Sequence, residues 1–294
     1  MNKFVISCES TVDLPYSHIC ERNIPVIFYT YNVDGTDYED DMGKNPDSLG
    51  NFYKMLDAGA KPTTSQINTD AYTRFLEPLI KQSDVLHIAF GSGMSASVYN
   101  AQAAAEQLNK KYKNRIVVID STCSCGGYGL LVDSAADMRD QGKSMDEIIA
   151  WLNANVHKLH HQFFSTDLSF FKRSGRMSAT TALIGTVLGI CPIMHLNYDG
   201  RIIAYARARG RKNAVVKTIA EMKANIPEGS AYSGKCYINH SNLLSFAQET
   251  KRRIMEEFPN IQEPQIYDIG PVITSHCGPG TVAVFFYGGD RSAE

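Results

Sequence analysis

Two patterns of apolar residues alternate along the first half of the chain. Near-continuous apolar runs at residues 84–90 and 115–119 are typical of parallel strands that are covered on both faces. Shorter apolar runs at residues 3–7 and 24–29 also predict strands. Between the two longer runs, residues 95–112 are rich in Ala, Gln, Glu and Leu, a composition that favours a helix. This alternation predicts an α/β domain built on a mostly parallel sheet.

The pattern changes near residue 160. The pair Asp199-Gly200 separates two apolar runs and predicts a β-hairpin. The elements predicted in this half are, in order, a strand at 163–171, hairpin strands at 191–197 and 201–208, a helix at 213–225, a strand at 235–240 and a helix at 242–258. A hairpin-bearing sheet with helices predicts an α+β domain. Because 294 residues is long for a single core, we expect two domains, residues 1–160 and 161–294.

Composition and charge narrow the function classes. Hydrophobic residues make up 44% of the chain and charged residues 20%, which indicates a folded, soluble protein. The formal net charge of −2 argues against bulk nucleic-acid binding, and no stacking aromatic residue follows Tyr205 in the basic run at residues 207–212. Lys3, Glu9 and Asp13 leave no room for a signal peptide, so we expect a cytoplasmic location.

Cysteine and histidine positions give no support for a metal site. The seven cysteines are odd in number and scattered, which predicts reduced thiols rather than a disulfide framework. Cys123 and Cys125 are close in sequence, but no second pair accompanies them. His157, His160 and His161 have helical spacing without a local carboxylate, which predicts an exposed, histidine-rich helix end. We therefore expect neither a metal nor a cofactor.

One glycine-rich turn is compatible with two different binding functions. The turn Gly91-x-Gly93-x-x-Ala96 follows a predicted strand and precedes a predicted helix, whose N-terminus favours an anion. It also fits the dinucleotide fingerprint, with Asp120 after the next strand, and so predicts a nicotinamide-dependent oxidoreductase as the alternative function. However, Asp120 lies farther along the chain than the roughly 20 residues that this motif requires.

Three other segments offer polar chemistry. The hydroxyl-rich residues 61–66 form either a donor loop or an ordinary helix cap. The basic residues 170–178 form either a solvated turn or a loop that binds an anion or a partner. Near the C-terminus, a strand-like run is expected to end at His276, where residues 278–280, Gly-Pro-Gly, impose a turn. That histidine is either held at a fixed place for function or incidental to a tight hairpin.

Taken together, seven short motifs resemble those of the DegV family, bacterial proteins that bind a fatty acid in a two-domain α/β fold. They are Glu9-Ser10-Thr11-Val12-Asp13-Leu14-Pro15, Thr64-Ser65-Gln66, Ser92-Gly93-Met94-Ser95, Asp120-Ser121-Thr122, Lys172-Arg173-Ser174-Gly175-Arg176-Met177-Ser178, Arg207-Ala208-Arg209-Gly210-Arg211-Lys212 and His276-Cys277-Gly278-Pro279-Gly280. The match covers essentially the whole chain. The sequence departs from the family pattern at Glu9, Gly91, Ile67 and Cys277.

The resemblance implies a non-enzymatic carrier of a long-chain fatty acid. Such a carrier presents the carboxylate to a separate ATP-binding fatty acid kinase subunit and contacts a membrane surface transiently. By matching position, Thr64 and Ser92 hold the carboxylate, and Ser65, Ser95 and His276 lie nearby. Positions expected to face the partner or the membrane are Arg173, Arg209 and Arg211. Residues expected to line the acyl tunnel are Phe163, Phe170, Leu183, Ile184, Val187 and Leu188.

Overall fold

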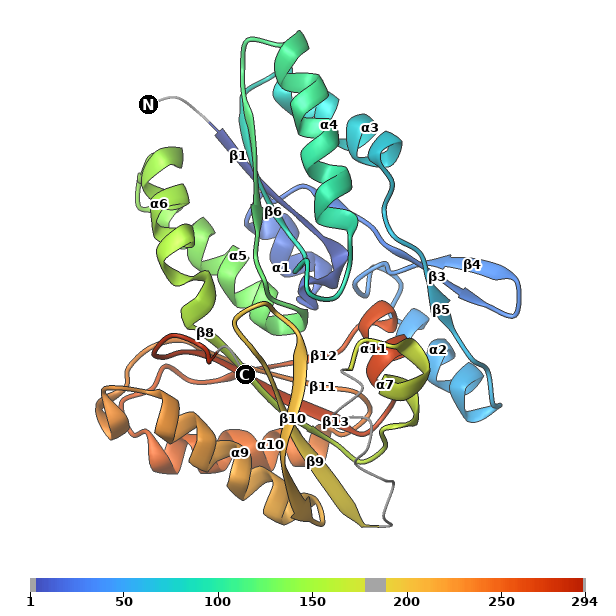
Figure 1. Ribbon diagram of the computed structural model, residues 1–294, viewed down its shortest axis with the longest axis vertical. Helices are drawn as coiled ribbons and strands as arrows, with labels where there is room; N and C mark the ends of the chain where they lie inside the picture. The colour runs from blue at the N-terminus through green and yellow to red at the C-terminus, as the bar shows by residue number, and fades with distance from the viewer. Residues whose placement is uncertain (1–3, 178–188, 293–294) are drawn as a thin grey trace.

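A four-stranded parallel sheet forms the core of the first half of the chain. The computed structural model describes residues 4–177 and 189–292. The strands are β1 (Phe4–Glu9), β2 (Val26–Ile27), β6 (Asp84–Ala89) and β7 (Ile116–Asp120), in the spatial order β2-β1-β6-β7 (Figure 1). The central strands β1 and β6 are almost entirely buried, which explains the near-continuous apolar run of β6. The predicted parallel α/β architecture is confirmed.

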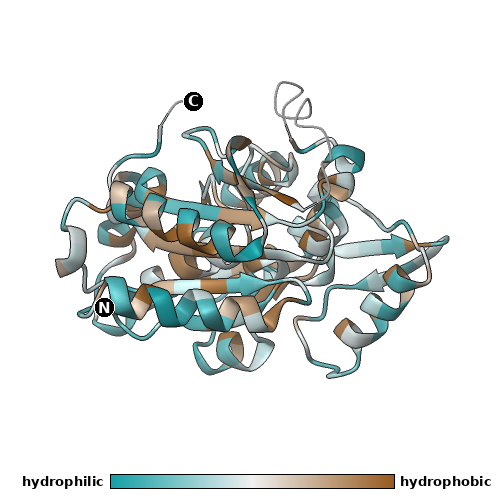
Figure 2. Ribbon diagram, turned by 90° about the horizontal axis from the view of Figure 1, so that it is seen from below, coloured by the Kyte–Doolittle hydropathy of each residue, from teal (hydrophilic) through white to brown (hydrophobic). Residues whose placement is uncertain are grey.

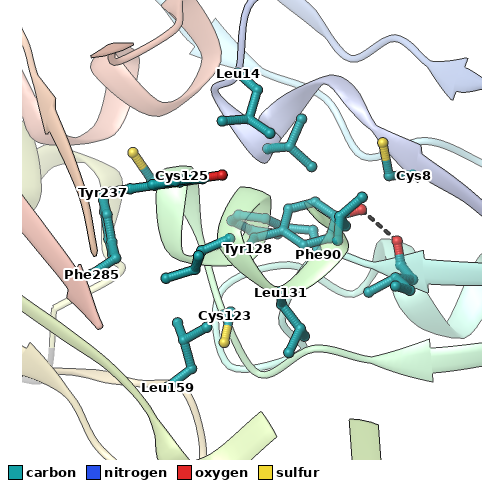
Figure 3. Close-up of a cluster of buried hydrophobic side chains, with 14 of the residues drawn as sticks. Cys8, Leu14, Phe90, Cys123, Cys125, Tyr128, Leu131, Leu159, Tyr237 and Phe285 are labelled. Atoms are coloured by element: carbon teal, nitrogen blue, oxygen red, sulfur yellow. Dashed lines mark hydrogen bonds between the residues drawn. The ribbon is translucent and has the colours of Figure 1, made fainter. Parts of the chain in front are cut away.

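Helices surround this sheet, and one of them joins it to the rest of the molecule. They are α1 (Tyr16–Glu21), α3 (Thr69–Ile80), α4 (Ser97–Lys111), α5 (Cys125–Asp140) and α6 (Met145–Asn155). Helix α5 lies between the four-stranded sheet and a second, larger sheet (Figure 1). Figure 3 shows side chains from both sides of it: Tyr128 lies beside Phe90, and Cys125 lies near Tyr237 and Phe285. The two halves therefore share one apolar core across α5.

The larger sheet has six strands in the order β10-β9-β8-β13-β11-β12. Their bounds are β8 (Leu159–Ser165), β9 (Ile190–Leu196), β10 (Ile202–Arg209), β11 (Cys236–His240), β12 (Gln265–Asp268) and β13 (Thr281–Tyr287). All neighbours pair antiparallel except β11 and β12. The face away from α5 is covered by α9 (Arg211–Asn225) and α10 (Leu244–Glu257). Figure 2 shows hydrophobic and hydrophilic positions mixed along the outer helices.

A small third sheet was not predicted from the sequence. It consists of β3 (Thr30–Val33), β4 (Thr36–Glu39) and β5 (Thr63–Thr64), paired antiparallel, with α2 (Ser48–Asp57) beside it. All four residues of β4 are exposed, so this strand carries no alternation of buried and exposed positions for a pattern to reveal. Short 3₁₀ helices complete the described chain at Ser10–Val12, Val156–Lys158 and Gly229–Ala231.

One predicted strand is wrong in part, and another is wrong altogether. The run at 163–171 ends as a strand at Ser165 and continues as helix α7 (Ser169–Ser174), because Asp167 accepts hydrogen bonds from the backbone N–H and hydroxyl of Ser169. The strand-like run before His276 is helix α11 (Pro271–Cys277), with proline at its first turn.

The predicted exposed histidine-rich helix end is also wrong. His160 and His161 are buried residues of β8, and His157 belongs to a 3₁₀ turn. Burial lowers the pKa of His160 to about 4.

An ion network ties α5 to both neighbouring layers. The buried Asp133 on α5 accepts hydrogen bonds from His18 and Arg22 on one side and from Lys235 and Tyr237 on the other. Burial alone would raise the pKa of Asp133, but the hydrogen bonds from His18 and Lys235 outweigh it and hold that pKa below its usual range. The network therefore connects the N-terminal half to β11 through one carboxylate.

Glycines on α5 permit this helix to approach the six-stranded sheet closely. A Cβ at Gly127 would lie 2.3 Å from His161 Nε2, whereas a Cβ at Gly50 on α2 would meet no atom within 4 Å. We expect Gly127→Ala to destabilise the protein by about 1–3 kcal/mol through overpacking. Gly50→Ala should instead stabilise it by about 0.5–1 kcal/mol, since alanine favours a helix interior. Urea unfolding of both variants checks this, and equal effects would contradict it.

Candidate functional site

Two adjoining cavities lie where the two halves of the chain meet. One, termed here the polar cavity, has a volume of about 80 Å³. The other, termed the apolar cavity, has a volume of about 60 Å³. The side chains that line both are Met94, Ser124, Phe171, Ile202, Ile273 and Cys277. The two cavities thus adjoin each other across a shared wall, one with a more polar and one with a more apolar lining.

The polar cavity collects hydroxyl groups and one imidazole from distant parts of the sequence. Thr64 and Ser65 come from β5 and the residue after it, Ser95 from the turn before α4, and His276 from α11. Thus four of the five residues predicted to surround a carboxylate line this cavity. The fifth, Ser92, does not line it; its backbone N–H donates to Asp120 Oδ1 at 3.1 Å.

Thr64 and His276 form a hydrogen bond at the polar end. Thr64 Oγ1 lies 2.7 Å from His276 Nε2, and His276 Nδ1 is buried without a hydrogen-bond partner among the described residues. Burial, with help from the nearby Arg176 and Arg173, lowers the pKa of His276 to about 4. The imidazole is therefore neutral near pH 7 and carries a single N–H.

The tautomer of His276 decides what Thr64 can do. If Nε2 carries the proton, it donates to Thr64 Oγ1, and the threonine O–H is free to donate to a ligand. If Nδ1 carries the proton, Thr64 donates to Nε2 and presents only lone pairs. An anion at this end of the cavity therefore favours the Nε2–H tautomer, in which His276 donates to Thr64 and Thr64 donates its own proton to the anion.

The polar cavity also contains residues that the sequence analysis did not assign to the site. Thr11 and Tyr29 line the polar cavity, and so does Arg176. The Thr11 hydroxyl is buried and has no hydrogen-bond partner in the described part of the chain. Thr11 lies within an N-terminal motif that the sequence already offered, whereas Tyr29 stands in an apolar run that gives no functional signal.

The glycine-rich turn is filled by the protein's own backbone. A Cβ at Gly91 would lie 2.8 Å from the backbone of Cys123, and one at Gly93 would lie 2.4 Å from the carbonyl oxygen of Asp199. In a dinucleotide fingerprint the glycines make room for a pyrophosphate. Here Asp120 is also committed, since it accepts hydrogen bonds from the backbone of Ser92 and Thr122. These contacts do not favour the oxidoreductase alternative.

A buried serine, histidine and glutamate resemble a catalytic arrangement, but they form a hydrogen-bonded group inside the core. Ser7 Oγ lies 3.0 Å from His87 Nδ1, and His87 Nε2 lies 3.4 Å from Glu9 Oε1. All three residues are fully buried, and none lines either cavity. Glu9 also accepts hydrogen bonds from Tyr72 and from the backbone N–H of Phe90. The group therefore anchors the start of the turn that carries Ser95.

Only some of the residues predicted to line the acyl tunnel can be placed relative to the cavities. Phe163 lines the apolar cavity. Phe170 lines neither cavity; its ring lies under the Arg173 guanidinium, 4.5 Å from ring centroid to Cζ, and packs against Gly278. Leu183, Ile184, Val187 and Leu188 lie outside the described residues.

The predicted partner-facing arginines are exposed. Arg173 lies on α7 and donates to the Ser275 carbonyl at 3.4 Å. Arg209 is the last residue of β10 and Arg211 the first of α9, so both lie at the same corner of the larger sheet. The Arg211 guanidinium lies 5.6 Å from the centre of the Phe246 ring.

The described ranges contain neither a cluster of metal ligands nor a membrane-spanning helix. Within residues 4–177 and 189–292, no group of His, Cys, Asp or Glu side chains has an arrangement that suits a metal ion. Among the helices in the same ranges, none combines the length and the apolar character that crossing a bilayer requires. All seven cysteines are free thiols, and six of them are buried.

Comparison with known proteins gives a consistent match. The family model described as "Uncharacterised protein, DegV family" matches residues 3–288. A DegV domain-containing protein of Clostridium perfringens is 36% identical over 290 residues, which is 98% of each chain. A fatty-acid-binding DegV family protein from Thermus thermophilus has a similar structure, with a TM-score of 0.87, 25% identity, and 98% of this chain and 100% of that chain covered.

A further similar structure is the fatty acid kinase B3 protein of Streptococcus pneumoniae, loaded with linoleic acid. Its TM-score is 0.84 at 20% identity, with 97% of this chain and 99% of that chain covered, so it speaks to the fold alone. The family model and the Clostridium relative each span nearly the whole sequence, and the observed sheets have the architecture of the solved relatives. The chain therefore belongs to the DegV family.

Proposed function

We propose that this protein is a non-catalytic carrier of a long-chain fatty acid. The carboxylate occupies the polar cavity, and the hydrocarbon tail occupies the apolar cavity. The observation that carries this proposal is that the polar and apolar cavities adjoin each other, with the Thr64–His276 hydrogen bond in the polar one. The fatty acids bound by structurally similar DegV proteins support it.

The two ends of the site contribute differently to binding. A buried carboxylate is costly unless hydrogen bonds replace its hydration, so the hydroxyls of Thr64, Ser95 and Thr11 must converge on it. One charge-assisted hydrogen bond contributes about 1.5–3 kcal/mol. Burial of ~14 methylene groups at ~0.8 kcal/mol each gives a gross ~11 kcal/mol before ordering costs. The tail therefore dominates affinity, and the polar end fixes orientation.

Binding requires movement of side chains between the cavities. Even together, the two volumes are below the ~300 Å³ at the lower end of typical ligand pockets. Met94, Phe171 and Ile273 line both cavities and so stand at their junction. Methionine changes rotamer easily, which makes Met94 a suitable residue to give way as the chain enters.

The same proposal includes presentation of the carboxylate to an ATP-binding kinase subunit in the cytoplasm. Ser65 and Arg176 are exposed residues that also line the polar cavity, so the carboxylate end lies near the surface. Arg173, Arg209 and Arg211 add exposed positive charge that suits a phosphorylated or acidic partner, or an anionic membrane surface met transiently. Likeness to the fatty acid kinase B3 fold and the free thiols support this assignment.

Ligand titrations separate the carrier from the oxidoreductase alternative. Delipidated protein should enhance the fluorescence of cis-parinarate, and oleate should displace that probe. NADH fluorescence should not change. Saturable NADH binding without parinarate binding would overturn the proposal and restore the dinucleotide reading.

The lowered pKa of His276 predicts a pH-dependent stability of the ligand-free protein. The unfolded chain binds a proton at His276 near its ordinary pKa of 6.5, whereas the folded chain does so only near about 4. The stabilisation is therefore complete above pH ~6.5 and is lost as pH falls toward ~4, by at most about 3 kcal/mol. Urea unfolding at several pH values should show a steeper acid loss for the native sequence than for His276→Gln. Parallel pH profiles would show that His276 is not held neutral by the fold.

A further inference from the structure

One part of the apolar cavity's wall places the small side chain of Ala283 among aromatic rings. Strand β13 alternates its residues between two cores: Val282 and Val284 face α9 and α10, whereas Ala283 and Phe285 face the apolar cavity. Across the pair with β8, Ala283 is opposite Phe163, and Phe285 is opposite His161. A methyl group is thus bordered by three rings on the sheet surface.

These residues define a notch in the part of the apolar cavity whose lining is not shared with the polar cavity. The notch comprises Ala283 with Phe163, Phe285 and His161 around it and Cys125 on the facing helix α5. None of these five residues lines the polar cavity. A chain whose carboxylate lies by Thr64 therefore passes Met94 and Ile273 first and reaches the notch with its distal methylene groups.

Polar side chains near the notch already make hydrogen bonds within the protein. His161 Nε2 accepts the backbone N–H of Ser124 at 3.1 Å, and its Nδ1 lies 3.3 Å from the Leu159 carbonyl oxygen, to which it donates. The Thr281 hydroxyl donates its proton to the Cys277 carbonyl at 3.4 Å, so toward a ligand it can act only as an acceptor. A hydroxyl on the distal part of a ligand would therefore find no free donor among these groups, and burying it only partly satisfied is costly.

We propose that the notch at Ala283 sets the length of the acyl chain and restricts the ligand to an unsubstituted hydrocarbon tail. This inference rests on the proposed function, because it presumes that a fatty acid enters from the polar end. A larger side chain at position 283 fills the space of the last methylene groups, and each pair of methylene groups displaced weakens binding by roughly tenfold. A glycine at that position extends the space instead.

Competition among acids of different length provides the test. The delipidated native protein, Ala283→Leu and Ala283→Gly are each incubated with an equimolar mixture of laurate, myristate, palmitate and stearate, and the bound acids are counted by native mass spectrometry. Relative to the native protein, Ala283→Leu should shift the bound mixture about tenfold toward shorter acids, and Ala283→Gly should shift it toward longer ones. Stearate with a mid-chain hydroxyl should compete at least tenfold less well than stearate.

Matched variants distinguish the possible failures. Val284→Leu adds bulk to the same strand on the opposite face, so it should leave the chain-length preference unchanged. Ala283→Val takes the place of Ala283→Leu if the leucine variant does not fold. If the native protein binds no acid, the proposed carrier function itself fails. If it binds acids but the Ala283 variants keep its length preference, or hydroxystearate competes as well as stearate, the notch inference is overturned.

Discussion

Replacing Thr64 with valine is expected to lower the affinity for a long-chain fatty acid by about 10- to 150-fold without unfolding the protein. Valine keeps the shape of threonine but has no hydroxyl, so the carboxylate loses one charge-assisted hydrogen bond of about 1.5–3 kcal/mol. The same change removes the partner of His276 Nε2, so the imidazole no longer has a defined tautomer. Equilibrium displacement of cis-parinarate by oleate measures the loss.

Two further variants show whether the loss belongs to the hydroxyl. Thr64→Ser keeps an O–H within reach of His276 and should bind within a few-fold of the native protein. Ser92→Ala should have a smaller effect than Thr64→Val, since Ser92 does not line the polar cavity. A larger effect for Ser92→Ala would indicate that the carboxylate binds at the glycine-rich turn. The family resemblance assigns Ser92 to carboxylate binding.

Removing the Glu9 side chain is expected to cost about 3–5 kcal/mol of unfolding free energy. Tyr72 Oη lies 2.6 Å from Glu9 Oε1, and the backbone N–H of Phe90 donates to Oε2 at 3.1 Å. In Glu9→Ala both donors stay buried without an acceptor, and each such loss costs about 1–3 kcal/mol. His87 loses its neighbouring carboxylate as well, and the truncated side chain leaves a void. Urea unfolding of the delipidated protein gives the difference.

An exposed glutamate provides the control for Glu9. Glu106 pairs with Lys110 on the surface of α4, one helical turn away, so Glu106→Ala should change stability by less than about 1 kcal/mol. Glu9→Ala should also weaken fatty acid binding, because Phe90 begins the turn that carries Ser95. A Glu9 variant as stable as the Glu106 variant would show that the buried network does not hold the core.

The local pattern of apolar and turn residues was sufficient to predict the elements whose burial follows directly from that pattern. Strands β6 and β7 and the β9–β10 hairpin were predicted because their apolar runs and the Asp199-Gly200 turn carry the information themselves. Helix α11 could not be predicted in this way, since Val272, Ile273 and Thr274 favour strands. Its start is fixed by Pro271 and by the Asp13 carboxylate, which accepts the backbone N–H of Gly270 from far away in the sequence.

No single motif was sufficient to predict the candidate site; the prediction relied on several motifs that occur in a particular order along the chain. Thr64, Ser95 and His276 come from three elements that no local pattern joins, and the resemblance to a known family brought them together. Thr11 and Tyr29 were missed because a hydroxyl next to a core strand looks like ordinary packing until the cavity is seen. The roles of all these residues remain predictions that the variants above test.

Native mass spectrometry of the freshly purified protein shows most directly whether each chain holds a fatty acid inside. We expect a mass excess that disappears on denaturation and that lipid analysis identifies as a long-chain fatty acid, in one copy per chain. A protein that carries no lipid, and takes up neither palmitate nor oleate after incubation, would rule out the carrier function.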